Sequence, residues 1–217
     1  MQKGFKRPKS KTELDEREAA GFWKAIALAN EIGLGDEKIS LDVILRIHKT
    51  MLGFSQPELA GRFRKDGEDV KKLECIEPPP GRLVAEQIYE MWRELDGRLA
   101  QIGRHSTTLN VKRKKEWLDK VIDTAAWAQH KLVAIHPFGE GNGRTARLLI
   151  NVILRRYGLP PSQVRFEGEN KKDYLQALCQ VDNYEDYDPL KHLILRGVID
   201  VYKREEKWRI KNKKKKA

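Results

Sequence analysis

The sequence predicts an all-α fold, a helical bundle built as one domain. Apolar residues recur at helical spacing through most of the chain. Glycines and prolines cluster between these segments, where helices are expected to end. At 217 residues, the chain is long enough to bury one core without the support of disulfides.

The first two helices follow from capping residues and apolar spacing. Residues 12 to 32 place Leu14 and Phe22 near one face, and a glycine-rich turn follows. Ser40 is the expected N-cap of the next helix. His48 falls on the apolar face of that helix, where a single histidine usually forms a hydrogen bond within the core. We therefore interpret His48 as structural and leave it out of the site.

The middle of the chain alternates irregular and helical segments. Prolines and glycines interrupt residues 53 to 81, within which residues 70 to 76 form either a short hairpin arm or a plain surface loop. An apolar stripe predicts a helix over residues 82 to 102, and a polar loop follows. The helical pattern from residue 117 to residue 135 leads directly into the most polar motif of the chain.

Three more helices are expected after that motif. Residues 148 to 154 are apolar on nearly all sides, as in a helix at the centre of a bundle. Glycine and proline at 158 to 161 end this helix. The last two helices are expected at about 170 to 181 and 190 to 204, the second opened by Asp188 as N-cap.

Charge and composition narrow the function classes. The net charge is +11 and the pI is about 9.6, but much of the excess lies at the two ends of the chain. A block of like charge such as Lys203 to Lys216 is usually solvated, so we favour a solvated tail over a nucleic-acid interface, with Trp208 as a packing anchor. The basic N-terminus lacks an apolar core and no run of about eighteen apolar residues occurs, so neither a signal peptide nor a membrane span is expected.

The two cysteines, Cys75 and Cys179, lie far apart and outside any CxxC spacing. Neither has a histidine beside it in the sequence, so the pattern predicts neither a zinc site nor a disulfide framework. This use of cysteine favours a reducing cytoplasm, with secretion as an effector left open as an alternative.

The segment from His136 to Arg147, HPFGEGNGRTAR, combines a base, a carboxylate, three glycines and two arginines. Its glycine-rich part lies where an apolar helix begins, and the free N–H groups of a helix start bind anions. Arg144 and Arg147, three residues apart, are placed to hold phosphate oxygens. Glu140 is an oxygen ligand of the kind that holds Mg²⁺ against phosphates, and His136 supplies a base.

This segment resembles the signature of the Fic/Doc (Fido) family, His-x-Phe-x-Asp/Glu-Gly-Asn-Gly-Arg-x-x-Arg, at every fixed position. Residues 61 to 64, GRFR, resemble the Gly-x-Tyr/Phe-Arg element of that family, and residues 160–161 and 174–178 resemble the usual sequel to the motif helix. The resemblance implies a Fic-type helical bundle with a small β-hairpin flap. The expected division is an N-terminal helical extension at 1–39, a Fic domain at 40–202 and a basic tail at 203–217.

The resemblance implies a protein adenylyltransferase, which moves AMP from ATP to a Ser, Thr or Tyr hydroxyl of a target protein and releases pyrophosphate. His136 would take the proton of the hydroxyl, and Mg²⁺ on Glu140 would neutralise the phosphates. Arg144 would stabilise charge on the phosphates, and Arg147 would hold the γ-phosphate. The assigned residues are His136, Asn142 and Arg144 for catalysis, Gly141, Asn142, Gly143, Arg144 and Arg147 for ATP, and Glu140 for the metal.

Two further contacts are implied by the resemblance. The flap would pair with an extended piece of the target protein and so position its hydroxyl. Tyr174 and Asn183 are candidates for contacts with the adenine or ribose. The expected flap consists of Val70, Lys71, Lys72, Leu73, Glu74, Cys75 and Ile76.

Regulation is a point of departure from many proteins of this kind, which carry an inhibitory helix reading Ser/Thr-x-x-x-Glu-Gly/Asn. Only Thr12 has a glutamate at the right distance, Glu16, and Arg17 follows where Gly or Asn belongs. We therefore expect either a separate antitoxin-like protein that supplies a glutamate to Arg147, or an enzyme controlled by access to its target. The alternative functions are transfer of phosphate, UMP or phosphocholine on the same fold, a basic nucleic-acid-binding module, and a pseudo-enzyme that serves as an interaction module.

Overall fold

The structure is a computed structural model that describes residues 8–68, 70, 75–103, 110–163 and 169–214. Helices make up its regular structure, which confirms the all-α prediction. Ile76 forms an isolated β-bridge, and the described residues contain no longer strand. The expected hairpin includes residues 71–74, which lie outside the described residues. The helices are α1 (Lys11–Leu34), α2 (Leu41–Leu52), α3 (Gly81–Ala100), α4 (Val111–Ile135), α5 (Asn142–Arg156), α6 (Glu169–Tyr184) and α7 (Asp188–Lys214).

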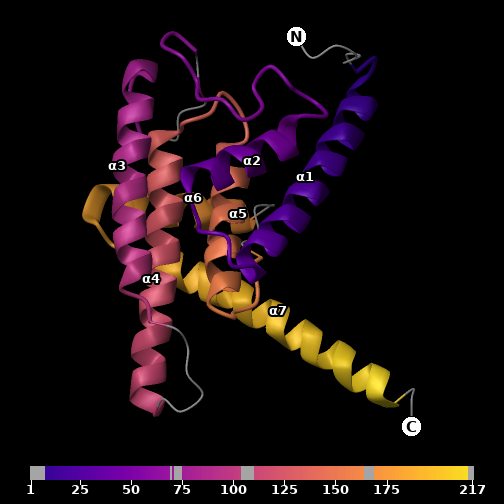
Figure 1. The fold of residues 1–217 in the computed structure, drawn as a ribbon, viewed down its shortest axis with the longest axis vertical. Coiled ribbons are helices and arrows are strands. Elements are labelled where there is room, and N and C mark those ends of the chain that lie inside the picture. Colours follow the sequence, from indigo (N-terminus) through magenta and orange to yellow (C-terminus); the bar gives the residue numbers. More distant parts are fainter. Residues whose placement is uncertain (1–7, 69, 71–74, 104–109, 164–168, 215–217) are drawn as a thin grey trace.

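Helix α5 lies at the centre of the bundle, packed between α4 and α1 (Figure 1). Its apolar side chains face neighbours on nearly every side, as the sequence predicts. Helix α1 approaches α2 closely at Gly21, where a Cβ atom would come within 2.2 Å of the Met51 carbonyl oxygen. The buried apolar side chains of α5 are Ala146, Leu148, Leu149, Ile150, Val152, Ile153 and Leu154.

Side-chain caps begin two of the long helices. The Ser10 hydroxyl accepts a hydrogen bond from the Glu13 N–H at 3.1 Å, and the Asn110 side chain accepts one from the Arg113 N–H at 3.0 Å. Ser40 precedes α2 as expected, although its side chain makes no capping hydrogen bond. These caps determine where α1 and α4 begin, and these two helices flank the motif helix α5.

The expectation that the cysteines form no disulfide is wrong. Cys75 and Cys179 are joined by a disulfide, with their Cα atoms 5.4 Å apart and the two residues 104 positions apart in sequence. Local spacing excludes a CxxC motif, but it carries no information on which distant segments meet in space. The bond ties the segment before α3 to α6. Because structural disulfides are typical of oxidising compartments, the cysteines no longer support a cytoplasmic location.

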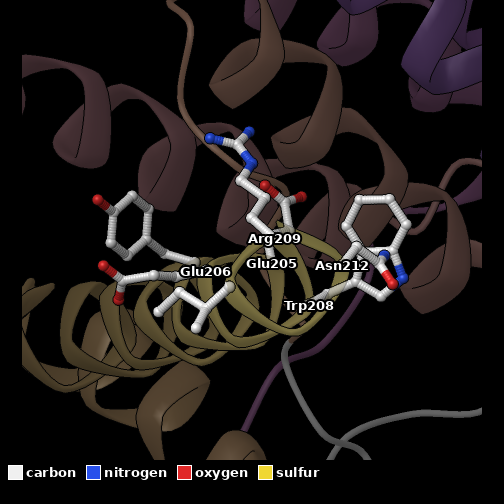
Figure 2. A pocket seen from close by; sticks show the side chains of 7 residues that line it. Glu205, Glu206, Trp208, Arg209 and Asn212 are labelled. Atoms are coloured by element: carbon white, nitrogen blue, oxygen red, sulfur yellow. The ribbon is translucent and has the colours of Figure 1, made fainter. Parts of the chain in front are cut away.

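Helix α7 continues well beyond the expected end at residue 204, and its C-terminal part extends away from the bundle (Figure 1). Trp208 does not anchor this part, because 67% of its surface is exposed. It borders a shallow hollow on the helix surface (Figure 2). The hollow is lined by α7 side chains and holds no residue of the motif. None of the described helices combines the length and hydropathy that a membrane span requires.

Candidate active site

The motif loop joins the end of α4 to the start of α5 through two left-handed residues. His136 follows the last residue of α4 with φ 51°, and its N–H donates to the Leu132 carbonyl. Gly141 precedes α5 with φ 82°, and a Cβ atom there would lie 2.8 Å from the Met51 methyl group. The left-handed conformation therefore favours glycine at this position, and a Cβ atom would also have to displace the end of the Met51 side chain.

His136 is held as a neutral imidazole with a defined tautomer. Its Nδ1 lies 3.2 Å from the Val133 carbonyl oxygen, which can only accept a hydrogen bond. Nδ1 therefore carries the proton, and the lone pair lies on Nε2. Burial lowers the pKa of His136, and the Val133 hydrogen bond opposes part of that shift. This protonation state is the one a general base requires.

Asn142 closes the motif loop with both ends of its amide. Its Oδ1 accepts from the Phe138 N–H at 2.9 Å, and its Nδ2 donates to the Phe138 carbonyl at 2.8 Å. The Asn142 side chain is 3% exposed, and Phe138 is fully buried beneath the loop. The side chain thus shapes the loop. A phosphate contact from Asn142 would come from its backbone N–H, which lies in the first turn of α5.

The Arg144 guanidinium lies between two carboxylates. Its Nη1 is 3.0 Å from Glu18 Oε2 on α1, and its Nη2 is 3.3 Å from Glu140 Oε1. The Glu140 carboxylate also accepts from the Gly141 N–H at 2.9 Å. Glu18 lies outside the Ser/Thr-x-x-x-Glu pattern, so sequence reasoning missed it. Glu16, the residue that the pattern points to, is exposed on the same helix.

Arg147 is held by a chain of hydrogen bonds that runs through α6 to α4. Its guanidinium forms a hydrogen bond with Tyr174, and burial lowers the pKa of Arg147 while it raises that of Tyr174. The Tyr174 hydroxyl also accepts from Gln129 Nε2 at 3.0 Å, and Tyr174 is 2% exposed. Asn183 is exposed near the end of α6. The structure thus brings Tyr174 to Arg147 and leaves Asn183 apart from it, while contacts of either residue with adenine or ribose stay predictions.

Two buried residues outside the motif hold its backbone. Arg64 donates from Nε to the His136 carbonyl at 2.7 Å, and its N–H donates to the Pro137 carbonyl at 2.8 Å. His48 is buried and hydrogen-bonded, as expected, but one of its partners is the Glu140 carbonyl at 2.9 Å. Sequence reasoning treated His48 as core only. The resemblance at residues 61 to 64 was the available signal that this region serves the motif.

Glu140 is the one motif carboxylate available to a metal, and its side chain is 46% exposed. Among the residues that the structure describes, no group of three or more His, Cys, Asp or Glu side chains is placed to hold a metal ion. Mg²⁺ commonly binds one or two carboxylates and takes its other ligands from substrate phosphates and water. The donor set therefore fits Mg²⁺ that arrives with a nucleotide.

Comparison with known proteins identifies the family of the chain. The profile of the Fic/DOC family matches residues 38–154. The chain belongs to this family. It is 32% identical over 197 residues to protein adenylyltransferase Fic of Nematostella vectensis, covering 88% of this chain and 41% of that relative. It is 33% identical over 184 residues to protein adenylyltransferase fic-1 of Caenorhabditis elegans, covering 84% and 32%.

The fold agrees with that of a Fic protein of known structure. A solved segment of Caenorhabditis elegans Fic-1 matches with a TM-score of 0.67 and 28% identity, covering 100% of this chain and 57% of that one. The chain thus spans less than half the length of these two curated relatives. The shared segment is the part that contains the motif.

Proposed function

We propose that this Fic protein transfers AMP from ATP to a Ser, Thr or Tyr hydroxyl of a target protein. Two observations support this proposal: the relatives are named protein adenylyltransferases, and the geometry of the site suits the reaction. The observation that carries the proposal is the tautomer of His136, whose Nδ1 bonds the Val133 carbonyl and whose Nε2 is left as a base. The loop that follows His136 leads to the start of α5, which carries Arg144 and Arg147. A helix start and arginines suit the phosphates of a nucleotide.

The reaction follows from these positions. His136 Nε2 accepts the proton of the target hydroxyl as its oxygen attacks the α-phosphorus of ATP. A bond forms between this oxygen and phosphorus, the bond from phosphorus to the bridging oxygen breaks, and pyrophosphate leaves. Backbone N–H groups at the start of α5 and the Arg144 and Arg147 guanidinium groups stabilise the phosphate charge.

Glu140 would hold Mg²⁺, which neutralises phosphate charge when it is bound with the nucleotide. The carboxylate that now accepts from the Gly141 N–H and contacts Arg144 is free to turn toward such an ion, because it is partly exposed. In the same way, Arg144 must leave Glu18 or Glu140 to contact a phosphate. A separate antitoxin-like protein that presents a glutamate to Arg147 is the proposed inhibitor.

Labelled ATP tests the proposal. Wild-type protein and His136→Ala are incubated with Mg²⁺, cell lysate and ATP labelled at the α or the γ phosphate. The proposal predicts protein label from the α position, none from the γ position, and none with His136→Ala. Label from the γ position alone would show phosphorylation and overturn the proposal.

A further inference from the structure

His48 lies directly beneath the motif loop, and the mechanism above gives it no task. It belongs to α2, 92 residues before Glu140, and no part of it is exposed. Its ring stacks on Phe138 with centroids 3.7 Å apart and planes 9° apart. The position that a Cβ atom would take on Gly141 lies 3.5 Å from His48 Nε2. His48 therefore contacts Phe138 and the Glu140 carbonyl of the motif loop and lies close to Gly141.

Both ring nitrogens of His48 are engaged, and their partners define its tautomer. The Gly61 N–H donates to Nδ1 at 2.9 Å, so Nδ1 is an acceptor and carries no proton. Nε2 carries the proton and donates to the Glu140 carbonyl, also at 2.9 Å. Burial lowers the pKa of His48 to about 4, so this neutral form persists at neutral pH.

The hydrogen bond to the Glu140 carbonyl sets the direction of the next N–H group. The peptide bond between Glu140 and Gly141 is trans, because the chain has no cis peptide bonds among its described residues. In a trans peptide the C=O and N–H vectors point in opposite directions. Since the Glu140 carbonyl points toward His48 on α2, the Gly141 N–H of the same peptide points away from α2.

The present partner of that N–H supports this direction. The Gly141 N–H donates to the Glu140 carboxylate, an anionic group, at 2.9 Å. The same carboxylate lies 3.3 Å from Arg144, so the N–H points into the anion site. We propose that His48 is a positioning residue, which fixes the Glu140–Gly141 peptide so that its N–H faces the phosphates of the nucleotide. This role rests on the proposed function.

Two variants, each of which mimics one ring nitrogen of His48, separate the two hydrogen bonds. The amide nitrogen of glutamine reaches the place of Nε2, so His48→Gln keeps the donor to Glu140 and loses the acceptor for Gly61. The amide oxygen of asparagine reaches the place of Nδ1, so His48→Asn keeps the acceptor and loses the donor. Both variants remove the ring stack, so they share its effect on stability and each is the control for the other.

Two readouts are measured on the full chain. Steady-state AMP transfer gives kcat and KM for ATP. The amide resonances of Gly61 and Gly141, followed by NMR during titration with Mg²⁺ and ATP, report the two hydrogen bonds without any need for turnover. We expect His48→Asn to lower kcat by about 10- to 100-fold, as displacement of a group that positions catalytic contacts does. We expect His48→Gln to restore most of this loss and to retain the ATP-induced shift of the Gly141 amide.

The outcomes separate this inference from the proposed function. Equal kcat values and equal Gly141 shifts in the two variants would overturn the role of His48. If the wild-type protein transfers no AMP, the proposed function fails. The Gly141 amide then still decides the positioning role, since loss of its response in His48→Asn alone supports the role and equal responses refute it.

Discussion

Because Arg144 is paired with Glu18, we predict that the negative charge of Glu18 on α1 weakens the binding of ATP. Arg144 has one terminal nitrogen at Glu18 and the other near Glu140, so both are occupied by carboxylates. A phosphate must compete for this guanidinium. Glu18→Gln removes the negative charge but keeps a side-chain oxygen that can accept from Gln56, which now lies 3.3 Å from Glu18.

The size of the effect follows from distance and exposure. The Arg144 Nη1 to Glu18 Oε2 distance is 3.0 Å, and the two side chains are 23% and 29% exposed. Hydrogen bonds to charged groups contribute about 1.5–3 kcal/mol, and partial exposure to water reduces the electrostatic part. We take about 1 kcal/mol, which corresponds to an affinity for ATP that is tighter by a factor of about 5.

Isothermal titration of Mg²⁺ and ATP into wild-type protein and Glu18→Gln measures this change. The matched control is Glu13→Gln, which removes a carboxylate from the same helix whose partner is Arg17 rather than Arg144. We expect Glu18→Gln to bind ATP more tightly than the wild type, and we expect the control variant to bind it with unchanged affinity. Equal affinities in Glu18→Gln and wild type, or weaker binding in Glu18→Gln, would refute the competition between Glu18 and phosphate.

Three other predictions address the rest of the bundle. Arg64→Lys should lower kcat by about 10- to 100-fold in a folded protein, because the 2.7 Å hydrogen bond that holds the His136 carbonyl is lost; activity at the wild-type level would contradict this. Cys75→Ser should lower the free energy of unfolding by about 2–4 kcal/mol in urea, and added reductant should do the same to the wild type but not to the variant. Burial lowers the pKa of His130 to about 4. Since the unfolded chain takes up this proton near pH 6.5, His130 should lower the free energy of unfolding by up to about 3 kcal/mol as the pH falls from 6.5 to 4. His130→Gln should remove this part of the slope and leave the part due to His48, whose pKa burial also lowers to about 4.

The helices and the motif were accessible from the sequence because both are encoded locally. The apolar spacing predicted helices over 12–32 and 82–102, and the structure has them at Lys11–Leu34 and Gly81–Ala100. The continuous apolar run after Arg147 predicted the buried α5. The spacing of the motif placed a base, a carboxylate and two arginines at the start of this helix.

The contacts between distant segments, three of which support the site, were not accessible, because each joins residues far apart in the chain. The pairs are Glu18 with Arg144, His48 with Glu140, Arg64 with His136, and Cys75 with Cys179. No local pattern states which distant segments will meet. The sequence classified His48 correctly as a buried residue, but only the fold shows that it is buried against the motif.

The central claim is AMP transfer with His136 as the base, and a balance of its two products tests it most directly. In one reaction with target-containing lysate, the α label retained on protein and the pyrophosphate released are measured together for wild type and His136→Ala. The account predicts one pyrophosphate for each AMP retained on protein, and neither product with His136→Ala. Protein label without pyrophosphate, or both products persisting in His136→Ala, would contradict it.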